Sequence, residues 1–276
     1  MKKGIDISKY NGVIDFSKLK SSGIEFVIIR LGWIGNKNNH TLDTKFEENY
    51  KNAKAQGLAV GCYVYSYVEN SEAMENAISW VKEKLKRKTF NYPLFLDVED
   101  NQISNIDKTT LTNLCKQFCN SFTNYVTGIY ANKHWFENKL NVNELTNYKI
   151  WLAEWNNQNM HTAKFKVDMW QYSSIGKVNG IVGNVDMNYC LNCDENGTMT
   201  GEIIGGDEEV KTYQNGSTRE DVFSDTNLTN KIGYLNPRES CDCFGIFNNR
   251  AIVRYKVDNS NNYKIGFCKW LGGVKQ

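Results

Sequence analysis

The stretch Leu94-Phe95-Leu96-Asp97-Val98-Glu99 is a short apolar run that ends in two carboxylates. Alternate residues of a β-strand point to the same face, so the side chains of Asp97 and Glu99 are expected to lie side by side. A packing role does not account well for two acids at the end of a buried strand, because burial of a carboxylate is costly. The pair matches what hydrolysis of a glycosidic bond requires, a proton donor beside a stabilising carboxylate.

Around this stretch, residues 1–193 alternate between β-branched runs and amphipathic helical patterns. The predicted strands are 4–7, 26–31, 59–65, 93–98, 127–130, 150–153 and 167–171. The predicted helices are 15–21, 46–56, 72–85 and 109–123, and Gly23 and Gly57 stand where the first two should end. The alternation predicts an α/β fold, an irregular TIM-like β/α barrel of about eight strands with fewer outer helices near its end.

The barrel brings acids that are distant in sequence to one place. In a parallel barrel the C-terminal ends of the strands meet at one rim. Asp6 ends the first predicted strand and Asp186 follows the last one, so both are expected beside Asp97 and Glu99. One acid after a strand is often only a turn or cap residue, but four acids at one rim favour an active site. The aromatic residues expected at this rim, as platforms for a sugar ring, are Tyr63, Tyr65, Tyr130, Trp151 and Trp170.

Composition limits the other classes of function. The 276 residues, 41% of them apolar, are enough for one large domain or for a large and a small one. No stretch approaches the roughly 20 apolar residues of a membrane span, so none is predicted. The net charge of +2 gives no support for nucleic acid as a partner, and none is predicted. The two lysines at the start precede no apolar segment, so no signal peptide is predicted.

The eight cysteines do not form an obvious metal site. His40, His134 and His161 are scattered singly, and none is next to a cysteine. Without a secretory signal the expected state is reduced thiols, most of them small buried residues. A structural metal at the Cys190-x-x-Cys193 pair is the less favoured alternative. No metal and no other cofactor is therefore predicted.

The rest of the chain divides into a linker and a second domain. Residues 194–210 contain six acidic residues, four glycines and no lysine or arginine, which is typical of a linker. Residues 211–276 show strand signals separated by turns and no helical period, which predicts a small all-β barrel. The predicted domains are therefore 1–193 and 211–276.

The motifs of the first domain resemble those of glycoside hydrolase family 25, the Chalaropsis-type lysozymes. In the family's order they are Gly4-Ile5-Asp6-Ile7-Ser8, Leu96-Asp97-Val98-Glu99, Trp151-Leu152-Ala153, Trp170-Gln171-Tyr172-Ser173-Ser174 and Asp186-Met187-Asn188. The resemblance covers nearly all of 1–193. It implies an irregular β/α barrel that cleaves the β-1,4 bond between N-acetylmuramic acid and N-acetylglucosamine.

The resemblance also implies roles for the acids. Glu99 matches the general acid, and Asp97 matches the acid that supports the reacting sugar's acetamido group or cationic centre. Asp6 and Asp186 match the other two carboxylates. Retention of configuration is predicted, with the nucleophile left open between an aspartate and the substrate's own acetamido oxygen. Val64, Trp155 and the Arg30–Trp33 loop depart from the commoner family pattern, whereas the four acids follow it.

The second domain resembles the bacterial SH3-type domains of clostridial wall hydrolases. The residues that carry this are Asn215-Gly216-Ser217-Thr218-Arg219-Glu220, Lys231-Ile232-Gly233-Tyr234-Leu235 and Gly266-Phe267. The resemblance implies cell-wall binding, and its candidate contacts are Tyr213, Tyr234, Phe247 and Trp270. For at least half of these aromatics the alternative, that they fill a small core, is favoured.

An enzyme with a wall anchor and no signal peptide resembles a phage endolysin. Such a protein stays in the host cytoplasm until lysis and then acts on the peptidoglycan of a Gram-positive, clostridial wall. Three alternatives stay open: a bacterial autolysin with the same chemistry, a wall-glycan-binding protein without catalysis, and a hydrolase whose carboxylates hold a hard cation. The sequence predicts no oligomeric state.

Overall fold

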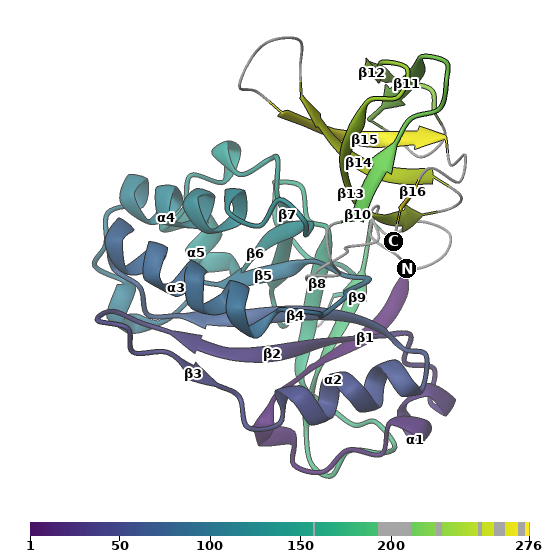
Figure 1. Ribbon diagram of the computed structural model, residues 1–276. Helices are drawn as coiled ribbons and strands as arrows, with labels where there is room; N and C mark the ends of the chain where they lie inside the picture. The colour runs from purple at the N-terminus through teal and green to yellow at the C-terminus, as the bar shows by residue number, and fades with distance from the viewer. Residues whose placement is uncertain are drawn as a thin grey trace. The chain divides into compact units, whose positions relative to one another are not determined.

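The computed structural model describes residues 1–156, 158–192, 211–224, 228–247, 250–256, 263–269 and 274–275. The chain divides into two compact units, Met1–Gly205 and Gly206–Gln276 (Figure 1). The predicted linker, 194–210, lies outside the described residues. Each unit is described here by itself.

Eight strands of the described first unit close into a ring, which confirms the predicted barrel. In ring order they are β1 (Lys2–Ile7), β2 (Phe26–Ile34), β4 (Ala59–Ser66), β5 (Leu94–Asp97), β6 (Thr127–Asn132), β7 (Lys149–Ala153), β8 (Met169–Gly176) and β9 (Val185–Cys190). Neighbours from β1 to β8 pair in parallel, whereas β9 is antiparallel to both β8 and β1. The short strand β3 (Thr41–Leu42) adds to the outer edge of β2.

Helices cover the outside of the barrel between the first six strands of the ring, from β1 to β7. They are α1 (Phe16–Ser21), α2 (Phe46–Ala55), α3 (Ser71–Lys84), α4 (Lys108–Asn120) and α5 (Lys133–Asn138), with short 3₁₀ turns η1 (Lys9–Asn11), η2 (Asn101–Ile103) and η3 (Val142–Glu144). The first four were predicted and α5 was not. Gly23 and Gly57 follow α1 and α2 with φ of 82° and 65°, which confirms their predicted place at helix ends. The described residues between β7 and β9 form no helix, as expected.

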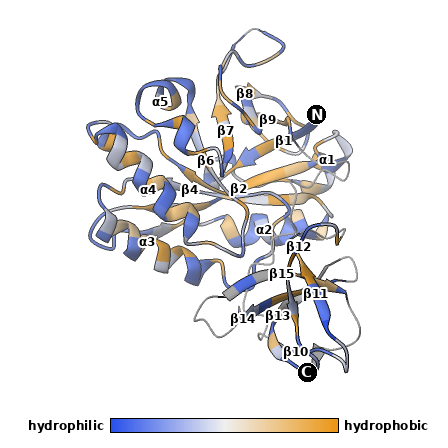
Figure 2. Cartoon of the chain, turned by 90° about the horizontal axis from the view of Figure 1, so that it is seen from above, coloured by the Kyte–Doolittle hydropathy of each residue, from blue (hydrophilic) through white to orange (hydrophobic). Residues whose placement is uncertain are grey.

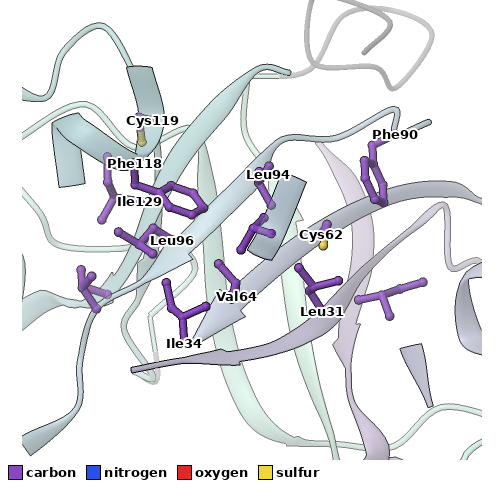
Figure 3. Close-up of a cluster of buried hydrophobic side chains, with 14 of the residues drawn as sticks. Leu31, Ile34, Cys62, Val64, Phe90, Leu94, Leu96, Phe118, Cys119 and Ile129 are labelled. Carbon is purple, nitrogen blue, oxygen red and sulfur yellow. The ribbon is translucent and has the colours of Figure 1, made fainter. Parts of the chain in front are cut away.

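The outer faces of the strands pack against the helices. Figure 3 shows Leu96 of β5 beside Ile129 of β6, with Phe118 and Cys119 of α4 nearby and Leu94 farther along β5, all of them buried. In Figure 2, β2 is mostly apolar, whereas α3 alternates between apolar and polar residues. This is the pattern of a strand buried on both faces and of a helix buried on one.

The inside of the barrel holds a separate aromatic core. Phe26, Phe95 and Trp151 are fully or almost fully buried there. A Cβ atom on Gly4 would lie 2.4 Å from the Phe26 ring, and one on Gly128 would lie 2.5 Å from the Phe95 ring. These rings therefore fill the interior of the barrel near the starts of the parallel strands. The polar side chains lie near the ends of these strands.

The second unit is all-β within its described residues. Its strands are β10 (Lys211–Gln214), β11 (Glu220–Phe223), β12 (Lys231–Leu235), β13 (Ser240–Phe247), β14 (Arg250–Lys256), β15 (Tyr263–Lys269) and β16 (Val274–Lys275). They form an antiparallel sheet in the order β12-β11-β15-β14-β13-β10-β16. The core contains Tyr213, Val222, Leu235 and Val253. The predicted all-β character is confirmed, and the SH3-like classification stays a prediction.

The cysteines differ from expectation at one position. Cys62, Cys115, Cys119, Cys241, Cys243 and Cys268 are free thiols, and five of these six are buried. Cys190 is disulfide-bonded, so the expectation of reduced thiols is wrong for this residue. Oxidation depends on whether a second thiol lies within bonding distance, which the fold decides. Among the described residues, no helix is long and apolar enough to cross a membrane.

Candidate active site

The alternation of each strand places the predicted acids above the aromatic core. Asp6 stands two residues after Gly4, and Asp97 stands two residues after Phe95, so both share the inward face of those residues. Glu99 lies two residues beyond Asp97, just past the end of β5. The acids therefore occupy the rim where the parallel strands end.

Asp186 lies at the same rim, but its position in the strand differs from the predicted one. It was expected to follow the last strand, and instead it stands near the start of β9. Because β9 runs antiparallel to β1, its beginning lies level with the end of β1, and Asp186 pairs directly with Asp6. Cross-strand partners have Cβ atoms about 4.5–5.5 Å apart. The two carboxyl groups are therefore immediate neighbours.

All four acids line one pocket of about 240 Å³, called the acid pocket here. Four of the five predicted aromatic residues line it too: Tyr63, Tyr65, Tyr130 and Trp151. Three further residues complete the lining: Arg30, Trp155 and Gln171.

Two carboxamides hold Asp6. Gln171 Nε2 and Asn188 Nδ2 donate to its Oδ2 at 2.9 and 2.8 Å. Each amide is oriented by a donor on its other side: Gln171 Oε1 accepts from the Tyr130 hydroxyl, and Asn188 Oδ1 accepts from Trp151 Nε1. Burial raises the pKa of Asp6 to about 6, although the two amides lower it. Asp6 is therefore fixed in place and titrates near neutral pH.

Asp97 is the most deeply buried of the four acids in the pocket, and one of its oxygens has no hydrogen-bond donor among the described residues. Its side chain is 3% exposed, and its Oδ1 accepts no hydrogen bond from the described residues. Burial, and then the charges of Glu99 and Asp6, raise its pKa well above the usual range, although the Arg30 guanidinium opposes this. A buried acceptor without a partner is costly, so this oxygen is suited to a group that arrives with a ligand.

Glu99 and Asp186 are half-buried and closer to solvent. Glu99 Oε2 accepts from Asn132 Nδ2 at 3.2 Å, and burial raises the pKa of Glu99. Burial and the charges of Asp6 and Glu99 raise the pKa of Asp186 to about 8. Asp186 therefore keeps a share of protonated carboxyl near neutral pH, and Glu99 holds its proton to a higher pH than an ordinary glutamate.

The aromatic side chains that line the acid pocket contact one another. The Trp151 ring meets Tyr63 edge-on at 5.9 Å between centroids and Tyr130 at 4.5 Å. Tyr65 donates from its hydroxyl to Asp100 Oδ2 at 2.9 Å. These contacts fix the rings that surround the acids.

Trp170 does not belong to the acid pocket, so its predicted role as a sugar platform is wrong. It is 2% exposed and packs in the layer outside the barrel, where its Nε1 donates to the Glu154 carbonyl at 2.9 Å. The neighbouring Gln171 points inward instead. Side chains alternate along β8, so only one of the two can reach the interior.

Among the predicted wall contacts, Tyr213 is fully buried and donates to Glu220 inside the second unit, so it cannot form part of a binding surface. Tyr234 is half-buried, with the Arg219 guanidinium 3.7 Å from its ring centroid. Trp270 lies outside the described residues, as does the side chain of Phe247.

The residues that position the acids were not predicted from the sequence. Gln171 and Asn188 belong to two of the family motifs. Each lies two residues from an inward-facing residue of its strand, so the alternation of side chains would have predicted that both face inward. Arg30 lies two residues after the inward Ile28, and its Nη2 and Nε contact Asp43 Oδ2 at 2.7 and 2.8 Å. Trp155, 61% exposed, donates from Nε1 to Gln171 Oε1 at 3.0 Å.

The described residues do not support the cation-dependent alternative. No group of three or more His, Cys, Asp and Glu side chains among them is arranged to hold a metal ion. Asp6 Oδ2, a potential ligand, already accepts from two amide donors. The arrangement suits proton transfer between carboxyl groups with raised pKa values.

Comparison with known proteins agrees with this geometry. The model of the family described as glycosyl hydrolases family 25 matches residues 5–181. The autolytic lysozyme of Clostridium acetobutylicum is 26% identical over 227 residues, which cover 77% of this chain and 63% of that protein. Lysozyme M1 of Streptomyces globisporus is 25% identical over 199 residues, which cover 67% of this chain and 66% of that protein.

A solved structure extends the likeness to three dimensions. The modular autolysin LytC from Streptococcus pneumoniae, in complex with a synthetic peptidoglycan ligand, matches with a TM-score of 0.59 and 27% identity. The match covers 68% of this chain and 46% of that one. The chain thus spans less than two thirds of the length of the two curated relatives and about half of LytC.

Proposed function

The chain belongs to family 25 of the glycosyl hydrolases, and from this premise we propose that it is a lysozyme, a peptidoglycan hydrolase. The bond that it cleaves is the β-1,4 bond between N-acetylmuramic acid and N-acetylglucosamine. The observation that carries the proposal is the meeting of four carboxyl groups, all with raised pKa, in one aromatic-walled pocket. The names of both curated relatives support it.

Glu99 is the general acid of this proposal. A glycosidic oxygen leaves readily only if it receives a proton as the bond breaks. Glu99 is half-buried at the rim, its pKa is raised by burial, and Asn132 holds one of its oxygens. These features support a carboxyl that holds its proton to a higher pH than an ordinary glutamate and lies at the rim where a sugar can bind.

Asp97 supports the reacting sugar from below. Its Oδ1 offers an acceptor for the acetamido N–H, and its ionised form supplies negative charge as the oxocarbenium-like centre develops. An acetamido group held there presents its own oxygen to the anomeric carbon, which gives a product with retained configuration. Direct attack by an aspartate also gives retention, through a covalent intermediate.

The test is the chemistry of the first products. Digestion of purified peptidoglycan should create new reducing ends on muramic acid and no new free amines. Proton NMR at early times should show the β-anomer first. The α-anomer would contradict retention, and reducing ends on N-acetylglucosamine would assign the enzyme to another bond.

We also propose that the second unit binds the cell wall. Support comes from its all-β sheet and from the half-buried Tyr234 beside the exposed Arg219, a pair suited to the face and edge of a glycan. Phe247 and Trp270 stay in this proposal as predicted contacts. A phage endolysin that acts on a clostridial wall stays the proposed biological role. Lysis of a panel of Gram-positive cell walls tests the host range.

A further inference from the structure

A second pocket lies at the rim, at the ends of β2 and β4 and beside η2. Its volume is about 420 Å³, and we call it the lateral pocket. Its lining consists of Trp33, Gly35, Asn36, Asn39, Tyr67 and Gln102. The volume lies within the range of about 300–1,000 Å³ that small-molecule sites occupy.

The lateral pocket adjoins the acid pocket through shared walls. Tyr65 lines the acid pocket, and its ring centroid lies 5.0 Å from that of Tyr67. Asp100 accepts from the Tyr65 hydroxyl through one oxygen and from the Gln102 backbone N–H through the other, at 2.9 and 2.8 Å. Tyr65 and Asp100 therefore connect the linings of the two pockets.

A β-bulge turns Trp33 toward this rim. The register between β2 and β4 shifts between Arg30 and Gly32, after which Trp33 pairs with Tyr65. Paired residues of neighbouring strands face the same side, so Trp33 points with Tyr65. Gly32 makes the bulge possible: its φ is 153°, and a Cβ there would lie 2.0 Å from the Thr41 carbonyl oxygen.

The chemistry of the lining points to a neutral, acetylated sugar. Trp33 and Tyr67 meet edge-on at 5.6 Å, and such rings accept the C–H face of a pyranose. The three carboxamides can donate to and accept from hydroxyl and acetamido groups. None of the described lining residues is charged, so the pocket offers no cation to the carboxylates of a stem peptide.

Hydrogen bonds hold the loop after β2, which carries Gly35 and Asn36, to itself and to the segment after β4. Asn36 Oδ1 accepts from the Glu69 backbone N–H at 3.0 Å, and the Tyr67 N–H donates to the Ile34 carbonyl at 2.8 Å. The Gly35 N–H donates to His40 Nδ1 at 3.3 Å. A preformed site loses less conformational entropy on binding.

We infer that the lateral pocket binds an N-acetylglucosamine unit of the glycan strand whose bond is cut in the acid pocket. The inference rests on the proposed lysozyme function and adds to it a subsite that selects longer strands. Trp33 supplies the stacking face, and Gln102 supplies a hydrogen bond at the shared wall.

The test compares long and short substrates in the full chain. The substrates are glycan strands with and without their stem peptides and the shortest fragment that the wild type cleaves. Trp33→Ala and Gln102→Ala should each raise KM for long strands, by ~10-fold for Trp33→Ala, and leave kcat unchanged. Trp33→Phe keeps an aromatic face and should recover most of the loss. Gln102 is exposed, so its variant tests the pocket without a risk to folding.

The outcomes separate this inference from the proposed function. If the wild type releases no reducing ends from either substrate, the proposed function is wrong. If the wild type is active but both variants change long and short substrates equally, the subsite is overturned. A KM effect that appears only with strands that still carry peptides would assign the pocket to the peptide and overturn the sugar assignment.

Discussion

Asp6 and Asp186 lie directly opposite each other in the antiparallel pair of β1 and β9, and each raises the cost of ionising the other. Burial raises the pKa of Asp6 to about 6, and burial together with the charges of Asp6 and Glu99 raises the pKa of Asp186 to about 8, against an ordinary 3.8. Two carboxyl groups so close titrate as a coupled pair. The pair therefore carries at most part of its possible negative charge at neutral pH, beside the acid that must donate a proton.

The first prediction concerns stability and pH. Between the ordinary pKa of 3.8 and the folded values of about 6 and 8, the folded state binds more protons than the unfolded state. Stability from this pair is thus complete below pH 3.8 and lost as pH rises through 8. Asp186→Asn should reduce the fall in melting temperature between pH 5 and 8.5, by ~2 °C or more.

Tryptophan fluorescence measures this transition in the barrel, because six of the seven tryptophans lie in residues 1–205. The control is Glu75→Gln, an exposed acid on α3, which should keep the wild-type dependence on pH. Equal pH dependence in wild type and Asp186→Asn would show that Asp186 ionises normally.

The second prediction concerns Glu99. Glu99→Gln keeps the shape and removes the donated proton, so hydrolysis of peptidoglycan should fall by at least ~100-fold. Because burial disfavours the ionised carboxylate, the neutral amide should leave the melting temperature unchanged or higher. Release of reducing sugar and thermal unfolding are measured together, with Glu75→Gln as the control. Near-normal hydrolysis in a folded Glu99→Gln protein would remove Glu99 from its role.

The acids could be predicted from sequence because each stands at a strand signal, where local patterning is strong. Asp97 and Glu99 follow an apolar run that is too short for a helix, and the barrel brings Asp6 to them. Asp186 was predicted at the correct rim but after the last strand, whereas it stands near the start of β9. The direction of β9 depends on its pairing with β8 and β1, and no local pattern encodes that pairing.

Which side chains face inward was harder to predict. In Met169-Trp170-Gln171 both faces of β8 are buried, so the sequence shows no alternation of apolar and polar residues. Trp170 looked like a sugar platform, and Gln171 looked like part of a motif without a role. A buried glutamine is stabilised only by partners from distant strands, here Asp6 and Tyr130, which the fold alone brings together.

The third prediction concerns the amides on Asp6. Gln171→Glu replaces the N–H donor by a carboxylate oxygen beside Asp6 Oδ2, which should raise the pKa of Asp6 above about 6. Asn188→Asp should act in the same direction. Carboxyl ¹³C NMR titration measures the shift. Gln117→Glu on α4 is the control and should leave Asp6 unchanged, whereas a lowered pKa in Gln171→Glu would contradict the assigned amide orientation.

The fourth prediction contrasts two tryptophans. Trp170 is buried outside the barrel, so Trp170→Ala should lower the free energy of unfolding by about 3–5 kcal/mol and leave KM for glycan near the wild-type value. Trp155 is 61% exposed in the acid pocket, so Trp155→Ala should raise KM with little loss of stability. Denaturant unfolding and steady-state kinetics measure both. The opposite assignment of effects would return Trp170 to the substrate site.

The last prediction concerns the two units. Each has its own buried core, so Met1–Gly205 and Gly206–Gln276 should fold when they are expressed separately. The first should cleave soluble glycan fragments with unchanged kcat and lose most of its activity on intact walls, because it no longer stays near the surface. The second should sediment with purified walls without releasing sugar. If Gly206–Gln276 folds but stays in solution with walls, the barrel finds its substrate unaided and the anchoring role is wrong.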